Sequence, residues 1–118
     1  MKKIPLFKPY MDSREAKAVA EVLKSGWISL GPKTEEFEQA FAKYVGAKYA
    51  VAVNSATSAL HLALLVFGVK KGDEVITTAL TFASTAEVIF YTGAKPVFAD
   101  IDPRTLTISP AEIEKKNN

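Results

Sequence analysis

The residues best suited to chemistry lie where a short β-branched run, residues 49–53, gives way to small hydroxyl side chains. The run favours a strand, and Asn54 and Ser55 then favour the cap of a helix. A helix that begins there points several unpaired backbone N–H groups at one spot, and such a spot attracts phosphate. The alternative is that Asn54 and Ser55 only cap a core helix, because caps are far more common than phosphate sites.

A sustained β-α pattern must position this junction. Residues 59–67 are apolar nearly all round, which predicts a helix that is buried between other elements. Residues 74–78 and 95–99 read as two further strands, and residues 83–91 read as the helix between them. With residues 49–53 as the first strand, the pattern predicts an α/β fold whose mainly parallel strands carry helices on both faces.

Two helices are expected ahead of the first strand. An extended arm over residues 1–11 leads to a capping box at Asp12, which begins a helix that ends near Ser25. Thr34 caps a second helix, which has a buried apolar stripe and ends before Gly46. A last helix begins at residues 109–112 and the chain stops soon afterwards, so we expect the sequence to be a fragment of a longer protein.

Three loops should meet at one edge of the sheet, because ligands of open α/β sheets collect outside the carboxyl ends of the strands. The first loop offers N–H groups and hydroxyls, the second offers the aromatic ring of Phe82, and the third offers the carboxylates of Asp100 and Asp102. An anion site beside an aromatic ring suits a flat, phosphorylated cofactor. Core packing is the alternative for Phe82, and for the carboxylates a turn or cap role is favoured over metal binding.

The loop GWISLGP, residues 26–32, is a second place for binding. Its glycines and proline prevent regular structure and expose Trp27 and Ile28. Trp27 either packs on its own domain or covers a ligand or a partner subunit.

The amino-acid composition limits the classes of function that the sequence supports. The 118 residues are 48% hydrophobic and 24% charged with a net charge of +2, which is typical of a globular protein and does not argue for nucleic-acid binding. There is no cysteine, hence no disulfide and no thiolate metal site, and we expect no metal. No signal peptide or membrane-spanning segment is evident, so a cytoplasmic protein without membrane contact is expected.

Five motifs in order resemble the N-terminal part of the DegT/StrS family of PLP-dependent nucleotide-sugar aminotransferases, which have fold type I. The resemblance covers the chain from Ile4 onward and rests on GWISLGP (26–32), TEEFEQAFA (34–42), NSATSALHLAL (54–64), TTALTFASTAEVI (77–89) and GAKPVFADIDP (93–103).

The resemblance implies roles for particular residues. The segment matching Ala56 and Thr57, with Ser55 before it, binds the phosphate of PLP through N–H groups and the threonine hydroxyl, and the aromatic matching Phe82 stacks on the pyridine ring. Family members often have glycine where Ala56 stands, and this small side chain should still let phosphate approach. No residue of this chain is implied to be catalytic.

The resemblance also implies a substrate site and partners. The loop holding Trp27, Ile28 and Ser29 lies near the nucleotide-sugar site at a dimer interface in the family, so these three residues become candidate substrate contacts. The implied substrates are a nucleotide-linked keto sugar and an amino donor such as glutamate, and a homodimer is expected.

The family's Schiff-base lysine and the acidic partner of the pyridine nitrogen match positions beyond Asn118, so we expect this chain alone to be inactive. The expected organisation is a single partial domain over residues 1–118, with an arm and helices over 1–46 and a β-α-β-α-β portion over 47–118. The central strands of the sheet are absent, and residues 49–53 then lack their partners. Two alternatives remain: a non-catalytic phosphate-binding or oligomerising module, and a PLP-dependent dehydratase, epimerase or regulatory relative.

Overall fold

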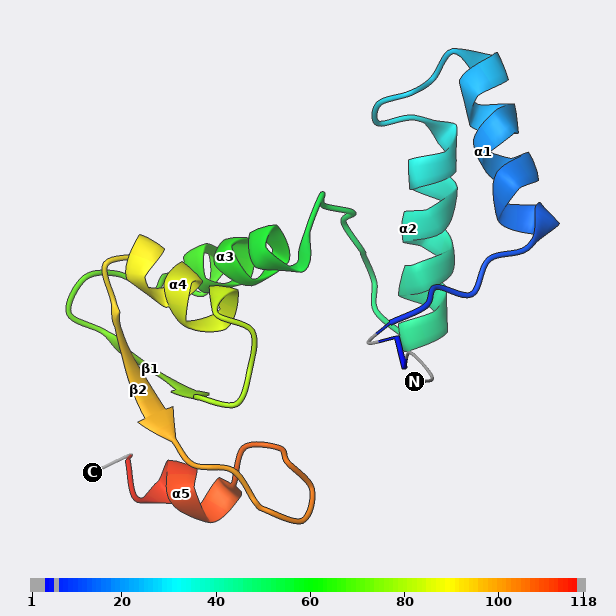
Figure 1. Cartoon of the computed structure of the whole chain (residues 1–118). Helices are drawn as coiled ribbons and strands as arrows, with labels where there is room; N and C mark the ends of the chain where they lie inside the picture. Colours follow the sequence, from blue (N-terminus) through cyan, green and yellow to red (C-terminus); the bar gives the residue numbers. More distant parts are fainter. Residues whose placement is uncertain (1–3, 6, 117–118) are drawn as a thin grey trace. The chain divides into compact units, whose positions relative to one another are not determined.

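The computed structural model describes residues 4, 5 and 7–116, and it divides the chain into two compact units, Met1–Ala52 and Val53–Asn118. Parts of the expected arm, residues 1–3 and 6, lie outside the described residues, as do residues 117 and 118. Each unit is described by itself, and both are drawn in Figure 1. The expectation of one partial domain divided after residue 46 stays a prediction.

The first helix, α1 (Ser13–Ser25), begins and ends as its sequence predicts. The Asp12 carboxylate accepts a hydrogen bond from the Arg14 N–H at 2.7 Å, and the Asp12 N–H donates to the Glu15 carboxylate at 2.7 Å. This reciprocal pair is a capping box. Gly26 takes the left-handed conformation that stops the helix, with a φ of 78°.

The second helix, α2 (Pro32–Val45), begins three residues earlier than predicted. Gly31 is its N-cap and Pro32 opens the first turn, so Thr34 lies inside the helix instead of capping it. Proline suits this position because it has no N–H to leave unpaired. The predicted buried stripe is also wrong: Ala42 is the only buried residue of α2, and Phe37 and Phe41 stay half exposed although their rings contact each other.

The predicted first strand does not form: among the described residues, 49–53 pair with no other strand. A carboxylate provides the one hydrogen bond to this stretch, because Glu38 Oε1 on α2 accepts from the Ala52 N–H at 2.7 Å. A strand needs a neighbour to satisfy its backbone, and the described part of the chain supplies none here. A β-prone sequence therefore remains an unpaired segment.

In the second unit, the two predicted strands have the predicted bounds. β1 (Glu74–Thr78) and β2 (Lys95–Ala99) pair in parallel, so the parallel α/β fold class is confirmed for this part of the chain. At the amino end of the sheet the Lys95 ammonium lies 2.7 Å from the Glu74 carboxylate. The described residues contain these two strands only.

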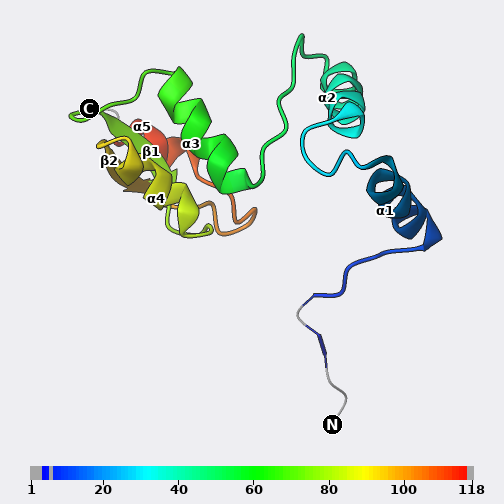
Figure 2. The same cartoon turned by 90° about the horizontal axis from the view of Figure 1, so that it is seen from above.

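One helix covers this sheet, and a second helix packs on the first. The helix between the strands, α4 (Ser84–Tyr91), packs on both strands, and α3 (Ala56–Val66) packs on α4 (Figures 1 and 2). The structure thus shows one covered face of the sheet, and helices on both faces stay a prediction for a larger sheet. The core lies under α4, where the largest buried side chains are Val88 and Ile89.

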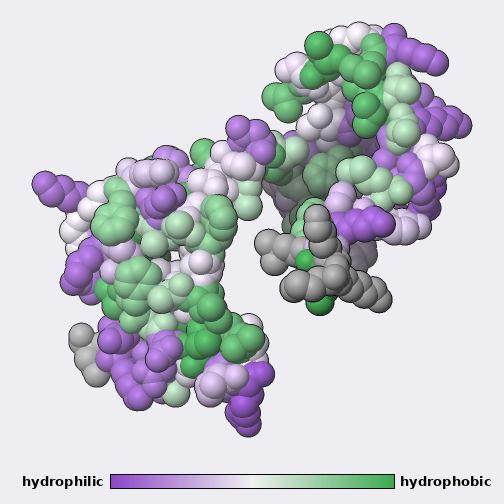
Figure 3. Space-filling model, in the orientation of Figure 1, coloured by the Kyte–Doolittle hydropathy of each residue, from purple (hydrophilic) through white to green (hydrophobic). Residues whose placement is uncertain are grey.

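The expected burial of α3 is wrong. None of its residues is buried, and Val66 and Phe67 at its end are 86% and 85% exposed. Figure 3 shows apolar side chains open to solvent on both units. Within the second unit α3 packs on α4, and this contact buries none of its residues, so its apolar composition has no matching burial there.

The end of the chain follows its cap signals. After β2, Ile101 and Ile108 form an isolated antiparallel bridge that closes a turn. The short helix α5 (Pro110–Glu114) then begins at Ser109, whose hydroxyl accepts from the Glu112 N–H.

Candidate functional site

The fold brings the predicted loops of the second unit to one end. Because β1 and β2 are parallel, their carboxyl ends share an edge, and the loops after Thr78 and Ala99 both begin there. Figures 1 and 2 agree that the N-terminal ends of α3 and α4 lie at the same end of this unit. This is the edge at which open α/β sheets bind ligands.

Ser55 is the N-cap of α3, so the capping role predicted for it is confirmed. Its hydroxyl accepts a hydrogen bond from the Ser58 N–H at 3.1 Å. The Ser58 hydroxyl in turn donates to the Asn54 side-chain oxygen at 2.7 Å. The three side chains satisfy one another, so they fix the start of the helix without any ligand.

The N–H groups of Ala56 and Thr57 remain available beside this cap. Within the described residues neither of them donates a hydrogen bond to any acceptor. The first turn of α3 carries no acidic side chain that would neutralise its positive end. Ala56 is exposed and Thr57 is half-buried, and unpaired N–H groups at the start of a helix are the kind of site that binds an anion.

Phe82 lies in the loop between β1 and α4 and is 79% exposed, so the alternative that it packs in the core does not hold here. It borders a hollow of about 370 Å³ that two further rings line, Phe90 of α4 and Phe98 of β2. Sequence reasoning did not single out these two rings. Ala83, Ala86 and Phe90 are spaced so that they lie on one face of a helix, and this spacing could have indicated that Phe90 belongs beside Phe82.

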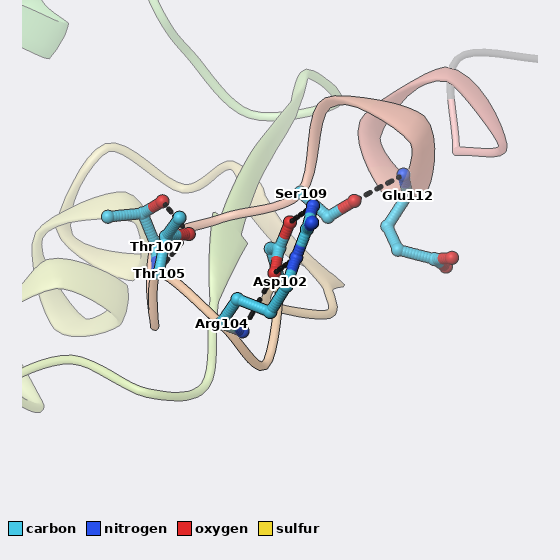
Figure 4. A network of polar contacts seen from close by, with 6 residues as sticks. All are labelled: Asp102, Arg104, Thr105, Thr107, Ser109 and Glu112. Atoms are coloured by element: carbon cyan, nitrogen blue, oxygen red, sulfur yellow. Dashed lines mark hydrogen bonds and ion pairs between the residues drawn. The ribbon is translucent and has the colours of Figure 1, made fainter.

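The third loop has a structural role, as favoured from the sequence (Figure 4). Asp102 accepts from the Arg104 N–H at 2.8 Å, and its other oxygen lies 3.2 Å from the Arg104 guanidinium. The side-chain hydrogen bond from Arg104, followed by the backbone one, holds the pKa of Asp102 below its ordinary value. In the described part of the chain no three acidic or histidine side chains gather in a way that could hold a metal ion.

The Trp27 loop belongs to the first unit and follows the end of α1. The Trp27 N–H donates to the Ser25 hydroxyl at 3.2 Å, and the Trp27 side chain lies against Gly31, where an added Cβ would be only 3.2 Å from its own. Trp27 and Ile28 are 61% and 75% exposed. Together with Ser29 they line a pocket of about 240 Å³ whose rim carries Lys33.

Lys33 is itself engaged on the surface. Its ammonium donates a hydrogen bond of 2.7 Å to the Glu36 carboxylate, and this bond raises the pKa of Lys33. The structure thus brings Trp27, Ile28 and Ser29 together around one pocket of the first unit and gathers Ser55, Ala56 and Thr57 at one helix start of the second.

Comparison with known proteins identifies the family. A model of the DegT/DnrJ/EryC1/StrS aminotransferase family matches residues 9–118. The chain belongs to this family. It is 56% identical over 111 residues to the spore coat polysaccharide biosynthesis protein SpsC of Bacillus subtilis, covering 94% of this chain and 28% of that protein. It is 48% identical to a UDP-4-amino-4-deoxy-L-arabinose–oxoglutarate aminotransferase of Shewanella sediminis, covering 94% of this chain and 29% of that protein.

Solved structures of this aminotransferase family agree. The PLP form of Spr1654 from Streptococcus pneumoniae, described as a sugar aminotransferase, matches with a TM-score of 0.88 and 39% identity, covering 97% of this chain and 29% of that one. DesV of S. venezuelae, solved with a ketimine intermediate, matches with a TM-score of 0.82 and 39% identity over 90% of this chain and 29% of that one. The chain therefore spans less than a third of the length of the relatives it matches. None of the helices described is long and apolar enough to cross a membrane.

Proposed function

We propose that this chain is the phosphate-binding portion of a PLP-dependent aminotransferase that converts a nucleotide-linked keto sugar to an amino sugar, with an amino acid such as glutamate as the donor. The observation that carries the proposal is the pair of unengaged N–H groups of Ala56 and Thr57 in a chain of an aminotransferase family. They stand at the start of an eleven-residue helix whose first turn has no acidic side chain.

The residues present fit the phosphate of PLP. Ser55, Asn54 and Ser58 complete the cap among themselves, so a phosphate would not have to displace any of their hydrogen bonds. The N–H groups of Ala56 and Thr57 donate to the phosphate oxygens, and the Thr57 hydroxyl donates a third hydrogen bond. The methyl group of Ala56 is the smallest side chain after glycine and leaves the helix start open to the anion.

Phe82 serves as the stacking surface for the flat ring of the cofactor. A ring that is 79% exposed at the carboxyl edge of the sheet has a free face for this contact. Phe90 and Phe98 line the same hollow and give it further apolar surface. When bound, PLP supplies an electron sink for the carbon that exchanges the amino group.

Trp27, Ile28 and Ser29 form part of the sugar-nucleotide site. Exposed aromatic and apolar surface in a loop, with a hydroxyl beside it, suits the base and sugar of a nucleotide. A nucleotide-linked sugar is the substrate class that the name of the Shewanella relative supports, because that name pairs a UDP-linked amino sugar with oxoglutarate.

Transamination needs a lysine that forms the Schiff base and an acidic group that holds the ring nitrogen protonated. In the family, these two roles belong to residues for which residues 1–118 hold no match, so we assign neither role to a residue of this chain. The partner that we propose for the complete active site is a second copy of the protein.

A graft tests this proposal. The 111 matching residues of the Shewanella aminotransferase are replaced by those of this chain, and amino transfer between oxoglutarate and the sugar nucleotide that names the enzyme is measured. The proposal predicts measurable activity for the graft with PLP and none for the 118-residue chain alone under the same conditions.

Two controls separate failure of the site from failure of folding. The graft must elute as a folded protein with the helical content of its host, and a graft of the same chain with Phe67→Ala must remain as active as the unmodified graft. A folded graft that does not transfer the amino group contradicts the proposal. The alternative of a dehydratase or epimerase relative predicts a folded graft that binds PLP but changes the sugar without amino transfer.

A further inference from the structure

We propose that Thr85 is a positioning residue of the cofactor site: through its hydroxyl and its N–H it holds the loop that carries Phe82, so that the ring is in place before PLP binds. The inference rests on the proposed stacking of Phe82 on PLP. It deepens that proposal, because it names a residue that acts through Phe82 without itself contacting the cofactor.

The loop that carries Phe82 is short. It consists of residues 79–83 and joins the end of β1 at Thr78 to the start of α4 at Ser84. Phe82 is 79% exposed, so side-chain packing within the second unit does little to hold its ring. The position of the ring therefore depends on how the backbone of the loop is held.

Thr85 bonds to two consecutive residues of this loop. Its hydroxyl and the Thr81 hydroxyl share a hydrogen bond of 3.1 Å. Its N–H donates to the Phe82 C=O at 3.0 Å. The two bonds span the peptide that joins Thr81 to Phe82, so Thr85 fixes both the residue that carries the ring and the residue before it.

Thr85 belongs to an element that is itself anchored. Thr85 is half-buried, and Ser84 beside it and Val88 one turn later are buried, at 7% and 2% exposure. These side chains belong to α4, which packs on both strands. The hydroxyl of Thr85 is thus a fixed point to which the loop is tied.

The bond between the two threonine hydroxyls is distinct from a helix cap. A capping side chain accepts from a free backbone N–H of the first turn, and α4 has no such bond at its N-cap, Ala83. In the described part of the chain, the hydroxyls of Thr81 and Thr85 bond only to each other. The effect of this bond therefore falls on the loop.

A loop that is held before the cofactor binds lowers the cost of binding. Ordering a flexible segment consumes part of the binding free energy, and a ring that is already in place avoids this loss. A single neutral hydrogen bond makes a modest net contribution, so we expect loss of the Thr85 hydroxyl to weaken cofactor binding about two- to tenfold.

NMR order parameters of backbone amides test the hold on the loop without any cofactor. In the 118-residue chain, Thr85→Val should lower the order parameters of Thr81 and Phe82 from about 0.85 toward about 0.6, and Thr85→Ser should restore them. Thr92→Val is the matched control, because the Thr92 hydroxyl donates to the Ile89 C=O at 2.8 Å at the other end of α4. Order parameters that do not respond to Thr85→Val overturn the inference.

Cofactor affinity tests the consequence in a graft of this chain into Spr1654, which has a PLP form. Thr85→Val should weaken PLP and pyridoxal alike, about two- to tenfold, because both present the ring that stacks on Phe82. Thr92→Val should weaken neither. In a Phe82→Ala background, Thr85→Val should have no further effect, whereas a residue that acts only on folding would lower the affinity in both backgrounds.

The same measurements separate this inference from the proposal on which it rests. If Phe82→Ala weakens PLP binding and Thr85→Val does not, or if the two losses add in the double variant, the positioning role of Thr85 is overturned and the stacking role of Phe82 stands. If Phe82→Ala leaves the Kd of PLP unchanged, the stacking role is overturned and the inference falls with it.

Discussion

The Glu38 carboxylate and the Ala52 N–H form a hydrogen bond of 2.7 Å between the middle of α2 and the segment that follows it. This bond joins residues fourteen positions apart and is the only one that fixes the backbone of residues 49–53 in the described chain.

Removal of this acceptor should release the segment. In Glu38→Ala, we expect the amide hydrogen of Ala52 to exchange about ten to a hundred times faster, because a hydrogen bond to a charged group is worth roughly 1.5–3 kcal/mol. Hydrogen exchange followed by NMR measures this directly. Glu36→Ala removes an exposed carboxylate of the same helix that bonds only to Lys33, and it should leave the Ala52 exchange rate unchanged.

Gly93 should tolerate a side chain less well than Gly68, although both have left-handed backbone, with φ of 80° and 76°. A Cβ at Gly93 would lie 3.2 Å from the Lys71 Cβ and 3.4 Å from the Lys71 Cα, whereas a Cβ at Gly68 meets nothing within 4 Å. Both alanine variants bear the left-handed cost of about 1–2 kcal/mol. Urea denaturation should show Gly93→Ala to be the less stable of the two, and equal stabilities would contradict the packing at Gly93.

The Asp102 carboxyl should titrate below its ordinary pKa of 3.8 because the Arg104 side chain and N–H both bond to its ionised form. A pKa that is lower in the folded chain means that this contact stabilises the turn at pH values above 3.8 and that the stabilisation is lost as the pH falls through the folded pKa. Carboxyl carbon shifts in NMR give the midpoint.

Arg104→Ala should raise the Asp102 midpoint toward 3.8 and leave that of Asp12 unchanged. Asp12 has the same arrangement with Arg14, which likewise lowers its pKa. Arg14→Ala should therefore raise the Asp12 midpoint and leave that of Asp102 unchanged. A midpoint of Asp102 that does not respond to Arg104→Ala would show that the contact in Figure 4 is absent in solution.

Signals within a few residues predicted most of the fold. The capping box at Asp12, the glycine after α1 and the β-branched content of both strands need no distant partner, and these elements have the predicted character. The start of α2 was missed because Gly31 and Pro32 fix it, although Thr34 is the better cap by residue type.

The predictions that were wrong concern contacts between residues that are distant in the sequence. Strand propensity at residues 49–53 cannot show that no strand will pair with them, and nothing in the local sequence links Glu38 to Ala52. The apolar composition of α3 predicts burial only if another element covers it. In the candidate site, the cap at Ser55 could be predicted from residue types, but Phe90 and Phe98 join Phe82 through the packing of α4 on β2.

If Phe82 stacks on the cofactor ring, its removal should weaken PLP binding, although removal of an exposed side chain usually has little effect. In a graft of this chain into Spr1654, which has a PLP form, Phe82→Ala should weaken PLP binding about tenfold, since an aromatic contact is worth roughly 0.5–1.5 kcal/mol beyond the buried area. Phe67→Ala is the control, because Phe67 is 85% exposed at the far end of α3. Equal PLP affinities for the two variants, measured from the visible absorbance, would contradict the role of Phe82.

The phosphate-binding role of the start of α3 is tested by the dissociation constants of PLP and of pyridoxal, which lacks the phosphate, measured in the same graft. With Thr57→Val, we expect PLP to bind about ten to a hundred times more weakly, because one hydrogen bond to a charged phosphate is lost, and we expect pyridoxal binding not to change. Thr57→Ser keeps the hydroxyl and should bind PLP nearly as the unmodified graft does. If Thr57→Val leaves the Kd of PLP unchanged, or weakens pyridoxal to the same extent, then the start of α3 is not the phosphate site.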